Sequence, residues 1–155
     1  MSKGLGMTGL PAWLPLANRV VRALNRLGAP LGTVHVLTVP GRRTGAPRST
    51  PVSPLTVGER RYVIAGLPDG DWARNVRVAG RGELARGRRR RPVTLTEVID
   101  ADERRAVMRA FPREVPHGVG FFVRLGLVTG GDPDQFAAAA DRVAVFRVAD
   151  GKGGA

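Results

Sequence analysis

Apolar and polar residues alternate along the middle of the chain, and this period of two predicts a β-rich fold. The clearest example is the run Val34-His35-Val36-Leu37-Thr38-Val39. Two glycine-containing segments, Val57-Gly58-Glu59-Arg60 and Arg86-Gly87-Arg88, each follow a strand-like run and predict hairpin turns. Strands are therefore expected at 33–39, 49–57 and 60–66, in a hairpin at 83–98, and at 142–148 near the end of the chain.

A second pattern, with apolar residues three to four positions apart, predicts helices around these strands. From Pro11 to Leu27 it gives an amphipathic helix, which Gly28 and Pro30 end. We expect this helix to pack on the sheet; contact with a membrane surface is the alternative, because Trp13 and several arginines suit an interface. Shorter helices are expected at 71–79, with Asp71 as cap, and at 100–111, with Asp100 or Asp102 as cap. A third is expected at 132–140, with Pro133 in its first turn. The apolar segment 121–128 fits either a helix or a strand.

The order of these elements indicates one antiparallel domain. Strands cluster in the middle of the chain, helices flank them, and one strand returns at the C-terminus. Regular βαβ alternation, which a Rossmann sheet requires, is missing from this order. We therefore expect a mainly β fold of about six strands that closes into a small barrel with peripheral helices. This single domain is expected to span residues 14–148, between flexible ends at 1–13 and 149–155.

Composition narrows the chemistry. The chain has no cysteine, which excludes disulfides and thiolate catalysis. Its two histidines, His35 and His117, have no second metal ligand at a suitable spacing, so no metal site is expected, and His35 within an apolar strand is interpreted as structural. The N-terminal residues lack the apolar core of a signal peptide, and no stretch approaches the roughly 18–20 apolar residues of a membrane span. We expect a cytoplasmic protein, with membrane association only through the N-terminal helix.

Positive charge is concentrated in the middle of the chain. The net charge is +12, and residues 42–91 hold 13 arginines against four carboxylates. Such a region attracts anions, and by charge alone the partner could be nucleic acid, anionic lipid or a phosphorylated small molecule. The segment Gly41–Pro51, called here the arginine segment, combines two glycines, three arginines and three hydroxyl side chains on one turn between two predicted strands. Backbone N–H groups freed by glycine, together with guanidinium groups, suit a phosphate or polycarboxylate ligand.

Four short motifs resemble the deazaflavin-dependent nitroreductase family. They are Gly41-Arg42-Arg43-Thr44-Gly45-Ala46-Pro47-Arg48, the strand end Val63-Ile64-Ala65-Gly66, Trp72 with Asn75 and Val76, and the final Val145-Phe146-Arg147. The resemblance extends over about residues 14–148. It implies a split β-barrel, similar to flavin reductases, that uses reduced coenzyme F420. This coenzyme carries a deazaflavin ring, a ribityl chain, a phosphodiester and a polyglutamate tail.

The resemblance also implies which residues bind the coenzyme. The phosphate and the nearby tail would be held by Arg42, Arg43, Thr44 and Arg48, and the ring would lie along Ser49, Thr50, Pro51, Val52 and Ser53. A strand end facing the ring or phosphate would be formed by Ile64, Ala65, Gly66 and Leu67. Trp72 would pack near the coenzyme, and Asn75 would either hydrogen-bond it or fix its own helix. The loop Leu67–Asp71 is short and acidic, so one cationic contact found in relatives is not expected here.

The function implied by this resemblance is transfer of a hydride from reduced F420 to a small acceptor: a quinone, an enone or a nitro compound. No protein residue is expected to be catalytic, because the coenzyme carries the chemistry. The alternatives are a non-catalytic F420 binder or carrier, a relative that binds FMN, and a basic nucleic-acid-binding domain. The last is disfavoured because one Tyr and two Trp offer few surfaces for base stacking. A dimer is compatible with the sequence, but nothing in it marks an interface.

Two further segments have a structural interpretation that we favour over a functional one. The run Arg88–Arg91 is expected to be a solvent-exposed hairpin, because alternate arginines on a strand point to opposite faces. Binding of the polyglutamate tail, a lipid or a nucleic acid is its alternative role. Phe121, Phe122 and Val123 are expected to pack in a core, with lining of the substrate entrance as the alternative.

Overall fold

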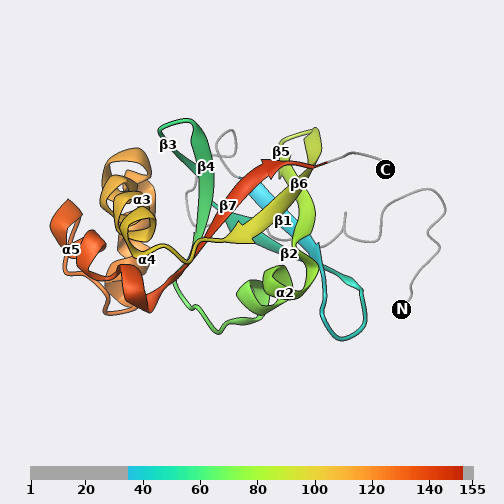
Figure 1. The fold of residues 1–155 in the computed structure, drawn as a ribbon, viewed down its shortest axis with the longest axis horizontal. Helices are drawn as coiled ribbons and strands as arrows, with labels where there is room; N and C mark the ends of the chain where they lie inside the picture. The colour runs from blue at the N-terminus through green and yellow to red at the C-terminus, as the bar shows by residue number, and fades with distance from the viewer. Residues whose placement is uncertain (1–34, 152–155) are drawn as a thin grey trace.

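The structure is a computed structural model, and it describes residues 35–151. The predicted amphipathic helix at 11–27, the N-terminal segment 1–13 and the last four residues lie outside this range. Within it, one seven-stranded antiparallel sheet curls into a half-barrel with helices at its side and below it (Figure 1). The strands run in the order β2-β1-β5-β6-β7-β4-β3. Their bounds are β1 His35–Pro40, β2 Pro47–Val52, β3 Leu55–Val57, β4 Arg60–Ala65, β5 Arg81–Arg86, β6 Arg89–Glu97 and β7 Ala144–Asp150.

The mainly β, antiparallel prediction is confirmed, with one more strand than expected. The predicted strand 49–57 is two strands, because the chain leaves the sheet at Ser53 and Pro54 between β2 and β3. Proline has no N–H to donate to a ladder, which favours a break at this point. β2 then lies at one edge of the sheet and β3 at the other. Turns at Gly58 and Gly87, both with positive φ, join β3 to β4 and β5 to β6 as predicted.

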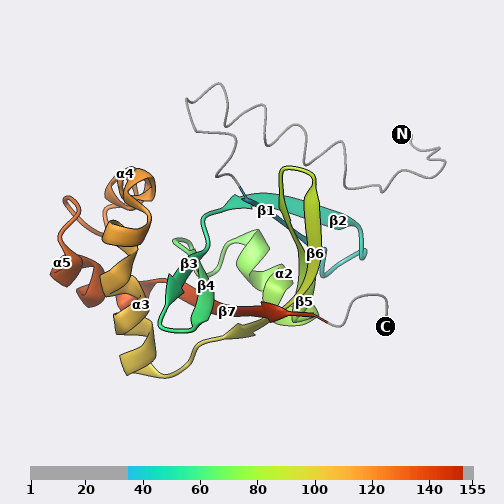
Figure 2. The same cartoon turned by 90° about the horizontal axis from the view of Figure 1, so that it is seen from above.

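The helices form two groups around the sheet (Figure 2). α2 (Asp71–Ala79) packs against β1, β5 and β6. The other group follows β6 in the chain and comprises α3 (Ala101–Glu114), η2 (Pro116–Gly118), α4 (Val119–Arg124), α5 (Pro133–Ala138) and η3 (Ala140–Arg142). We call this second group the helical layer. The ambiguous segment 121–128 therefore begins in a helix.

The predicted helix caps have mixed outcomes. Asp100 caps α3 by accepting a hydrogen bond from the backbone N–H of Glu103 at 2.8 Å. Asp132 caps α5 in a similar way, with Pro133 at the first helical position. The prediction for Asp71 was wrong: Gly70 is the N-cap of α2 and offers no side-chain acceptor. The Asp71 carboxylate instead contacts Arg42, as described below.

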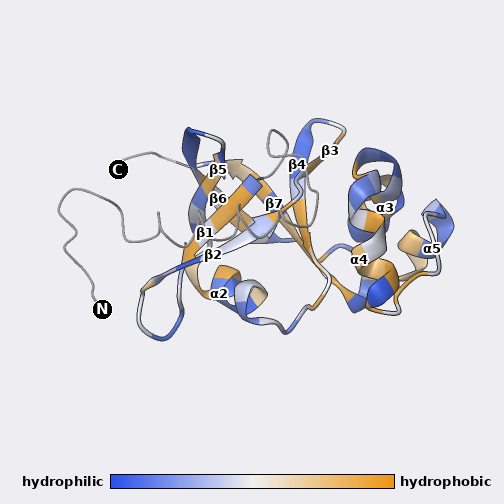
Figure 3. Cartoon of the chain, turned by 180° about the vertical axis from the view of Figure 1, so that it is seen from behind, coloured by the Kyte–Doolittle hydropathy of each residue, from blue (hydrophilic) through white to orange (hydrophobic). Residues whose placement is uncertain are grey.

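Two hydrophobic cores meet at strands β4 and β7. On β4, Tyr62 belongs to a core shared with the helical layer, and the next residue, Val63, belongs to a core inside the half-barrel. On β7, Val145 lies in the first core and Phe146 in the second. Successive side chains on a strand point to opposite faces, so both strands are covered on both sides. The central strands are accordingly hydrophobic, whereas the β1–β2 and β5–β6 turns are hydrophilic (Figure 3).

The basic hairpin between β5 and β6 is solvent-exposed, as predicted. All four side chains of Arg88–Arg91 are exposed. The Arg91 guanidinium lies 3.3 Å from the Asp150 carboxylate on the same side of the sheet.

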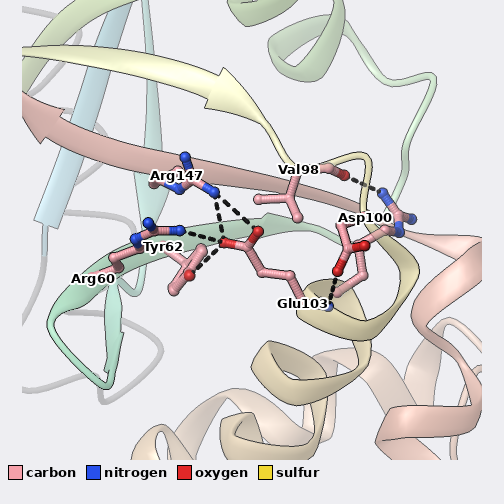
Figure 4. A network of polar contacts seen from close by, with 7 residues as sticks. Arg60, Tyr62, Val98, Asp100, Glu103 and Arg147 are labelled. Carbon is pink, nitrogen blue, oxygen red and sulfur yellow. Dashed lines mark hydrogen bonds and ion pairs between the residues drawn. The ribbon is translucent and has the colours of Figure 1, made fainter.

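A polar network joins the half-barrel to the helical layer. Glu103 on α3 accepts hydrogen bonds from the Tyr62 hydroxyl at 2.6 Å and from the Arg147 guanidinium at 2.8 and 2.9 Å. Arg60 lies 3.5 Å from the same carboxylate (Figure 4). The bonds from Tyr62 and Arg147 lower the pKa of Glu103 below its ordinary value. Burial, and then the bond to Glu103, raises the pKa of Tyr62.

Replacing Glu103 with alanine should destabilise the fold by at least about 2 kcal/mol at pH 7, because charge-assisted hydrogen bonds are lost and their donors remain. Because the pKa of Glu103 is lowered in the folded state, its carboxylate contributes its full free energy of stabilisation above the ordinary glutamate pKa of about 4.3. This stabilisation is lost as the pH falls through the folded-state pKa. Urea unfolding at pH 7 and pH 3 should therefore show a wild-type advantage that shrinks in acid. The matched control is Asp102→Ala, whose exposed carboxylate pairs with Arg105 on the same helix and should contribute only about 0.5 kcal/mol. Equal losses for the two variants would contradict this account.

Candidate functional site

A large cleft lies where the half-barrel meets the helical layer. Its volume is about 1380 Å³, above the roughly 300–1,000 Å³ of most small-molecule sites. One wall comes from the β1–β2 loop, strand β2 and the start of α2. The other wall comes from the end of α3, from η2 and from α4, and the end of β4 lies between the two walls. The cleft is therefore large enough for a long cofactor together with a second small molecule.

The arginine segment folds as a closed loop followed by a strand. Residues 41–46 form the loop, and the chain enters β2 at Pro47. The Gly41 N–H donates to the Ala46 carbonyl and the Gly45 N–H donates to the Gly41 carbonyl, both at 2.8 Å. Gly45 has a φ of +79°, a conformation that side chains other than glycine rarely adopt. The expectation that glycine frees backbone N–H groups for an anion is thus corrected at these two residues, whose amides close the loop.

Arg42 anchors this loop to α2. Its backbone N–H and its guanidinium both donate to the Asn75 side-chain oxygen, at 3.0 and 2.9 Å. The guanidinium also lies 3.3 Å from the Asp71 carboxylate, which is 91% exposed. Asn75 is only 4% exposed, so its amide is held in place among core residues. Of the two predicted roles for Asn75, the structure shows the fixing of local structure.

The remaining arginines of the segment face the cleft as unpaired cations. Arg43 and Arg48 are exposed and line the cleft, and within residues 35–151 neither forms an ion pair. The Thr44 hydroxyl, also at the cleft, accepts a hydrogen bond from the Ala46 N–H at 3.2 Å. Two guanidinium groups without carboxylate partners favour binding of a phosphate or carboxylate at this end.

Strand β2 offers a polar edge next to these cations. Every residue from Ser49 to Ser53 lines the cleft. β2 is an edge strand paired only with β1, and an edge strand presents N–H and C=O groups that a ligand can use. Ser49 is fixed by a 2.8 Å hydrogen bond between its hydroxyl and that of Thr38. A flat heterocycle with polar atoms on its rim could hydrogen-bond along this edge.

The end of β4 forms the floor between the two walls. Ile64, Gly66 and Leu67 line the cleft, but Ala65 is buried in the barrel core and does not. A Cβ on Gly66 would lie 2.7 Å from a methyl of Leu125 and 2.9 Å from the Phe121 ring. Glycine therefore allows the helical layer to approach this strand end closely. Trp72 lines the cleft and also packs on the core, with its ring 5.9 Å from that of Phe146.

The second wall was largely missed by sequence reasoning. Phe121 is 44% exposed at the cleft, while Phe122 is buried, so the two predicted roles are divided between these neighbours. Core packing was wrong for Val123, which is 38% exposed and does not line the cleft. His117 reaches across the cleft, its Nε2 atom 3.4 Å from the Ser53 hydroxyl oxygen. These two residues are 64 positions apart, and no local pattern marks such a contact. The lining residues not predicted as coenzyme contacts are Gly41, Gly70, Asp71, Phe111, His117, Gly118, Phe121, Phe122 and Arg124.

Within residues 35–151, no group of three His, Asp or Glu side chains could hold a metal ion. No helix in the same range is long and apolar enough to cross a membrane.

Comparison with protein families decides the identity of the site. The family model for F420H(2)-dependent quinone reductases matches residues 15–119. The chain belongs to this family. F420 is accordingly the cofactor, and the protein is an F420H2-dependent oxidoreductase. The resemblance to F420-dependent split barrels inferred from the arginine segment is confirmed.

One solved structure shares the fold, and two more distant structures are similar to the chain. A structure described as a domain-swapped dimer has a TM-score of 0.52 and 16% identity, over 86% of this chain and 99% of its own. A putative 5-nitroimidazole antibiotic resistance protein from Bacteroides thetaiotaomicron has a TM-score of 0.46 and 12% identity, over 87% and 80%. A NimC/NimA family protein from Clostridium acetobutylicum has a TM-score of 0.49 and 12% identity, over 86% of each chain. No curated protein matches the chain.

The residues of the cleft fit F420 in three respects. Arg43 and Arg48 supply the positive charge that a phosphodiester and a polyglutamate tail need. The edge of β2 supplies polar backbone beside a flat ring. The volume of about 1380 Å³ leaves room for an electron acceptor as well. The residues present therefore fit a cofactor of this chemistry.

Replacing Asp71 with asparagine should tighten F420 binding by up to about fivefold. Asp71 competes for the Arg42 guanidinium and repels an anionic ligand, and an exposed pair of this kind contributes about 0.2–1 kcal/mol. Titration of F420 fluorescence with protein measures the effect. The control is Asp69→Asn, which removes the same charge from the same loop without touching Arg42. Equal tightening by both variants would show that only net charge matters, and weaker binding by Asp71→Asn would contradict the competition.

Proposed function

We propose that this protein reduces a quinone by transferring a hydride to it from reduced F420. Enones and nitro compounds, which also accept electrons, are further acceptors. The observation that carries the proposal is the polarity of the cleft. Its coenzyme end is cationic, through Arg43 and Arg48. Its other wall, here called the aromatic end, exposes the ring of Phe121 and also carries His117 and Arg124. An apolar, planar acceptor suits the aromatic end.

The arginine segment would bind the anionic part of the coenzyme. We assign the phosphodiester and tail to Arg43, Thr44 and Arg48, since these side chains face the cleft. Arg42 would act chiefly as the anchor that holds this loop on α2 through Asn75. The ring would lie along Ser49–Ser53, with Trp72 at its side.

When bound, reduced F420 supplies a hydride, and the residues of this chain have to place the acceptor against it. Phe121 and Leu67, both exposed at the cleft, form an apolar rim around the space left beside β2. Contact with this rim removes water from one face of the acceptor and orients its ring. Binding two ligands face to face replaces a bimolecular encounter in solution with a step inside one complex.

Space for a second ligand favours an enzyme over a coenzyme carrier. A carrier needs only the cationic loop and the strand edge. This cleft continues past Ser53 to η2 and α4, where the exposed side chains of His117 and Phe121 add surface that the anionic tail does not need. The aromatic end is therefore assigned to the electron acceptor.

The double variant Arg43→Ala/Arg48→Ala should weaken F420 binding by at least about tenfold, because each guanidinium offers a charge-assisted hydrogen bond to an anion. The matched control is Arg88→Ala/Arg89→Ala, which removes the same charge from the exposed β5–β6 hairpin and should change binding less than threefold at physiological salt. Fluorescence titration measures binding for both. Loss of absorbance of reduced F420 in the presence of menadione, an enone or a nitroarene measures turnover by the wild type. Tight binding without turnover of any acceptor would contradict quinone reduction and favour a carrier.

A further inference from the structure

We propose that His117 is the general acid that protonates the reduced acceptor. The proposal rests on the function proposed above, because it concerns the acceptor side of the same cleft. His117 lies on η2, is exposed, and faces Ser53 at the end of β2. It therefore stands where the strand edge assigned to the ring meets the aromatic end assigned to the acceptor.

The turn that carries His117 is held firmly. Pro116 begins η2, and its ring fixes the backbone φ angle. Gly118 packs directly on the buried Phe111, since a Cβ there would come within 2.7 Å of that ring. Val115, just before the turn, is also buried. These contacts fix the backbone from which the His117 side chain extends into the cleft.

The contact between His117 and Ser53 leaves the imidazole available. The distance of 3.4 Å between Nε2 and the hydroxyl oxygen exceeds the usual range of a hydrogen bond to a side-chain hydroxyl. Catalytic contacts are often long before substrate binds and shorten in the complex. The ring can therefore turn from Ser53 toward an acceptor oxygen placed between β2 and α4.

The other ionisable side chains of the cleft do not suit proton transfer. Arginine keeps its proton at any physiological pH, which sets aside the four arginines that line the cleft. Asp71 forms an ion pair with Arg42 on the wall opposite η2. No Tyr, Lys or Cys is among the described residues that line the cleft. Imidazole is the side chain that both gives up and regains a proton between pH 5 and 8, so His117 is the group able to cycle.

The reaction requires one such proton for each turnover. A quinone that gains a hydride takes up two electrons and one hydrogen nucleus, which leaves the monoanion of the hydroquinone. The protonated imidazole of His117 gives its proton to this oxyanion, an O–H bond forms as the N–H bond breaks, and the hydroquinone is complete. The neutral imidazole then takes a proton from water. Arg124, on the same wall, can stabilise the oxyanion before the proton arrives.

The test compares His117→Gln and His117→Ala with the wild type over a series of quinones whose hydroquinones range from weak to strong acids. F420 affinity, measured by fluorescence titration, should stay within about twofold. Turnover of quinones with weakly acidic hydroquinones should fall about 100-fold, within the range expected for loss of a general acid. Turnover of tetrachlorobenzoquinone, whose hydroquinone anion is stable without a proton, should fall less than about threefold. Added imidazole should restore His117→Ala toward wild-type rates only for the weakly acidic members.

Other outcomes overturn the proposal in distinguishable ways. A uniform loss over the whole series, or F420 binding weakened tenfold, would mean that His117 has a structural role. Unchanged turnover in both variants, with an active wild type, would overturn the assignment of His117 alone. A wild type that binds F420 but reduces no quinone, enone or nitro compound would overturn the proposed function, and the assignment of His117 with it.

Discussion

The structure depends on the burial of β4 and β7 on both faces. Val63 and Phe146 fill the half-barrel, while Tyr62 and Val145 turn toward the helical layer. Removing apolar surface from water contributes about 25 cal/mol per Å², so strands covered on both sides gain about twice as much as surface strands. The two layers thus share two strands, and neither layer is complete without the other. The contact of Glu103 with Tyr62 and Arg147 adds a directional bond to this apolar junction.

The cleft is a consequence of this junction. β4 ends at Ala65, and the chain leaves the barrel through Gly66, where the missing side chain admits Phe121 and Leu125 from the helical layer. The chain then turns into α2, which returns to cover the barrel and carries Asn75 to the arginine segment. One strand end therefore connects the wall that holds the cations with the wall that holds the aromatic side chains. A change in how the helical layer sits on β4 would alter the shape of the acceptor space directly.

Local signals made half of the site predictable from the sequence. The arginine segment and the β2 run are consecutive residues whose motif resembles a known family. The residues predicted from this resemblance, other than Ala65, line the cleft. Ala65 belongs to the strand end that the resemblance implies as a contact, but the alternation of a strand turns its side chain into the barrel. The glycine amides were assigned to a ligand because the closure of the 41–46 loop on itself cannot be seen from composition.

The missed half was not predictable for a different reason. His117 meets Ser53 only because α3, 14 residues long, carries the chain across the face of β3 and β4 before η2 turns back. That path is set by tertiary packing, and the sequence around Pro116 reads equally well as a surface turn. Asp71 shows the same limit on a smaller scale: the helix begins at Asp71 itself, so Gly70 holds the cap position, and the Asp71 carboxylate contacts Arg42, 29 residues earlier.

The two ends of the cleft consequently differ in how far single residues can be substituted without disturbing their neighbours. The arginine segment is one continuous stretch whose loop is closed by the Gly41 and Gly45 amides and anchored to α2 through Arg42. The acceptor end gathers single side chains from separate elements, with Phe121 on α4 and His117 on η2. A substitution at Phe121 changes the shape of the acceptor space without breaking any hydrogen bond of the 41–46 loop. Because His117 and Phe121 lie on different elements, the shape of the acceptor space can change while the position of the proposed proton donor stays the same. Such a division suits a protein that holds one long cofactor and meets acceptors of varied shape.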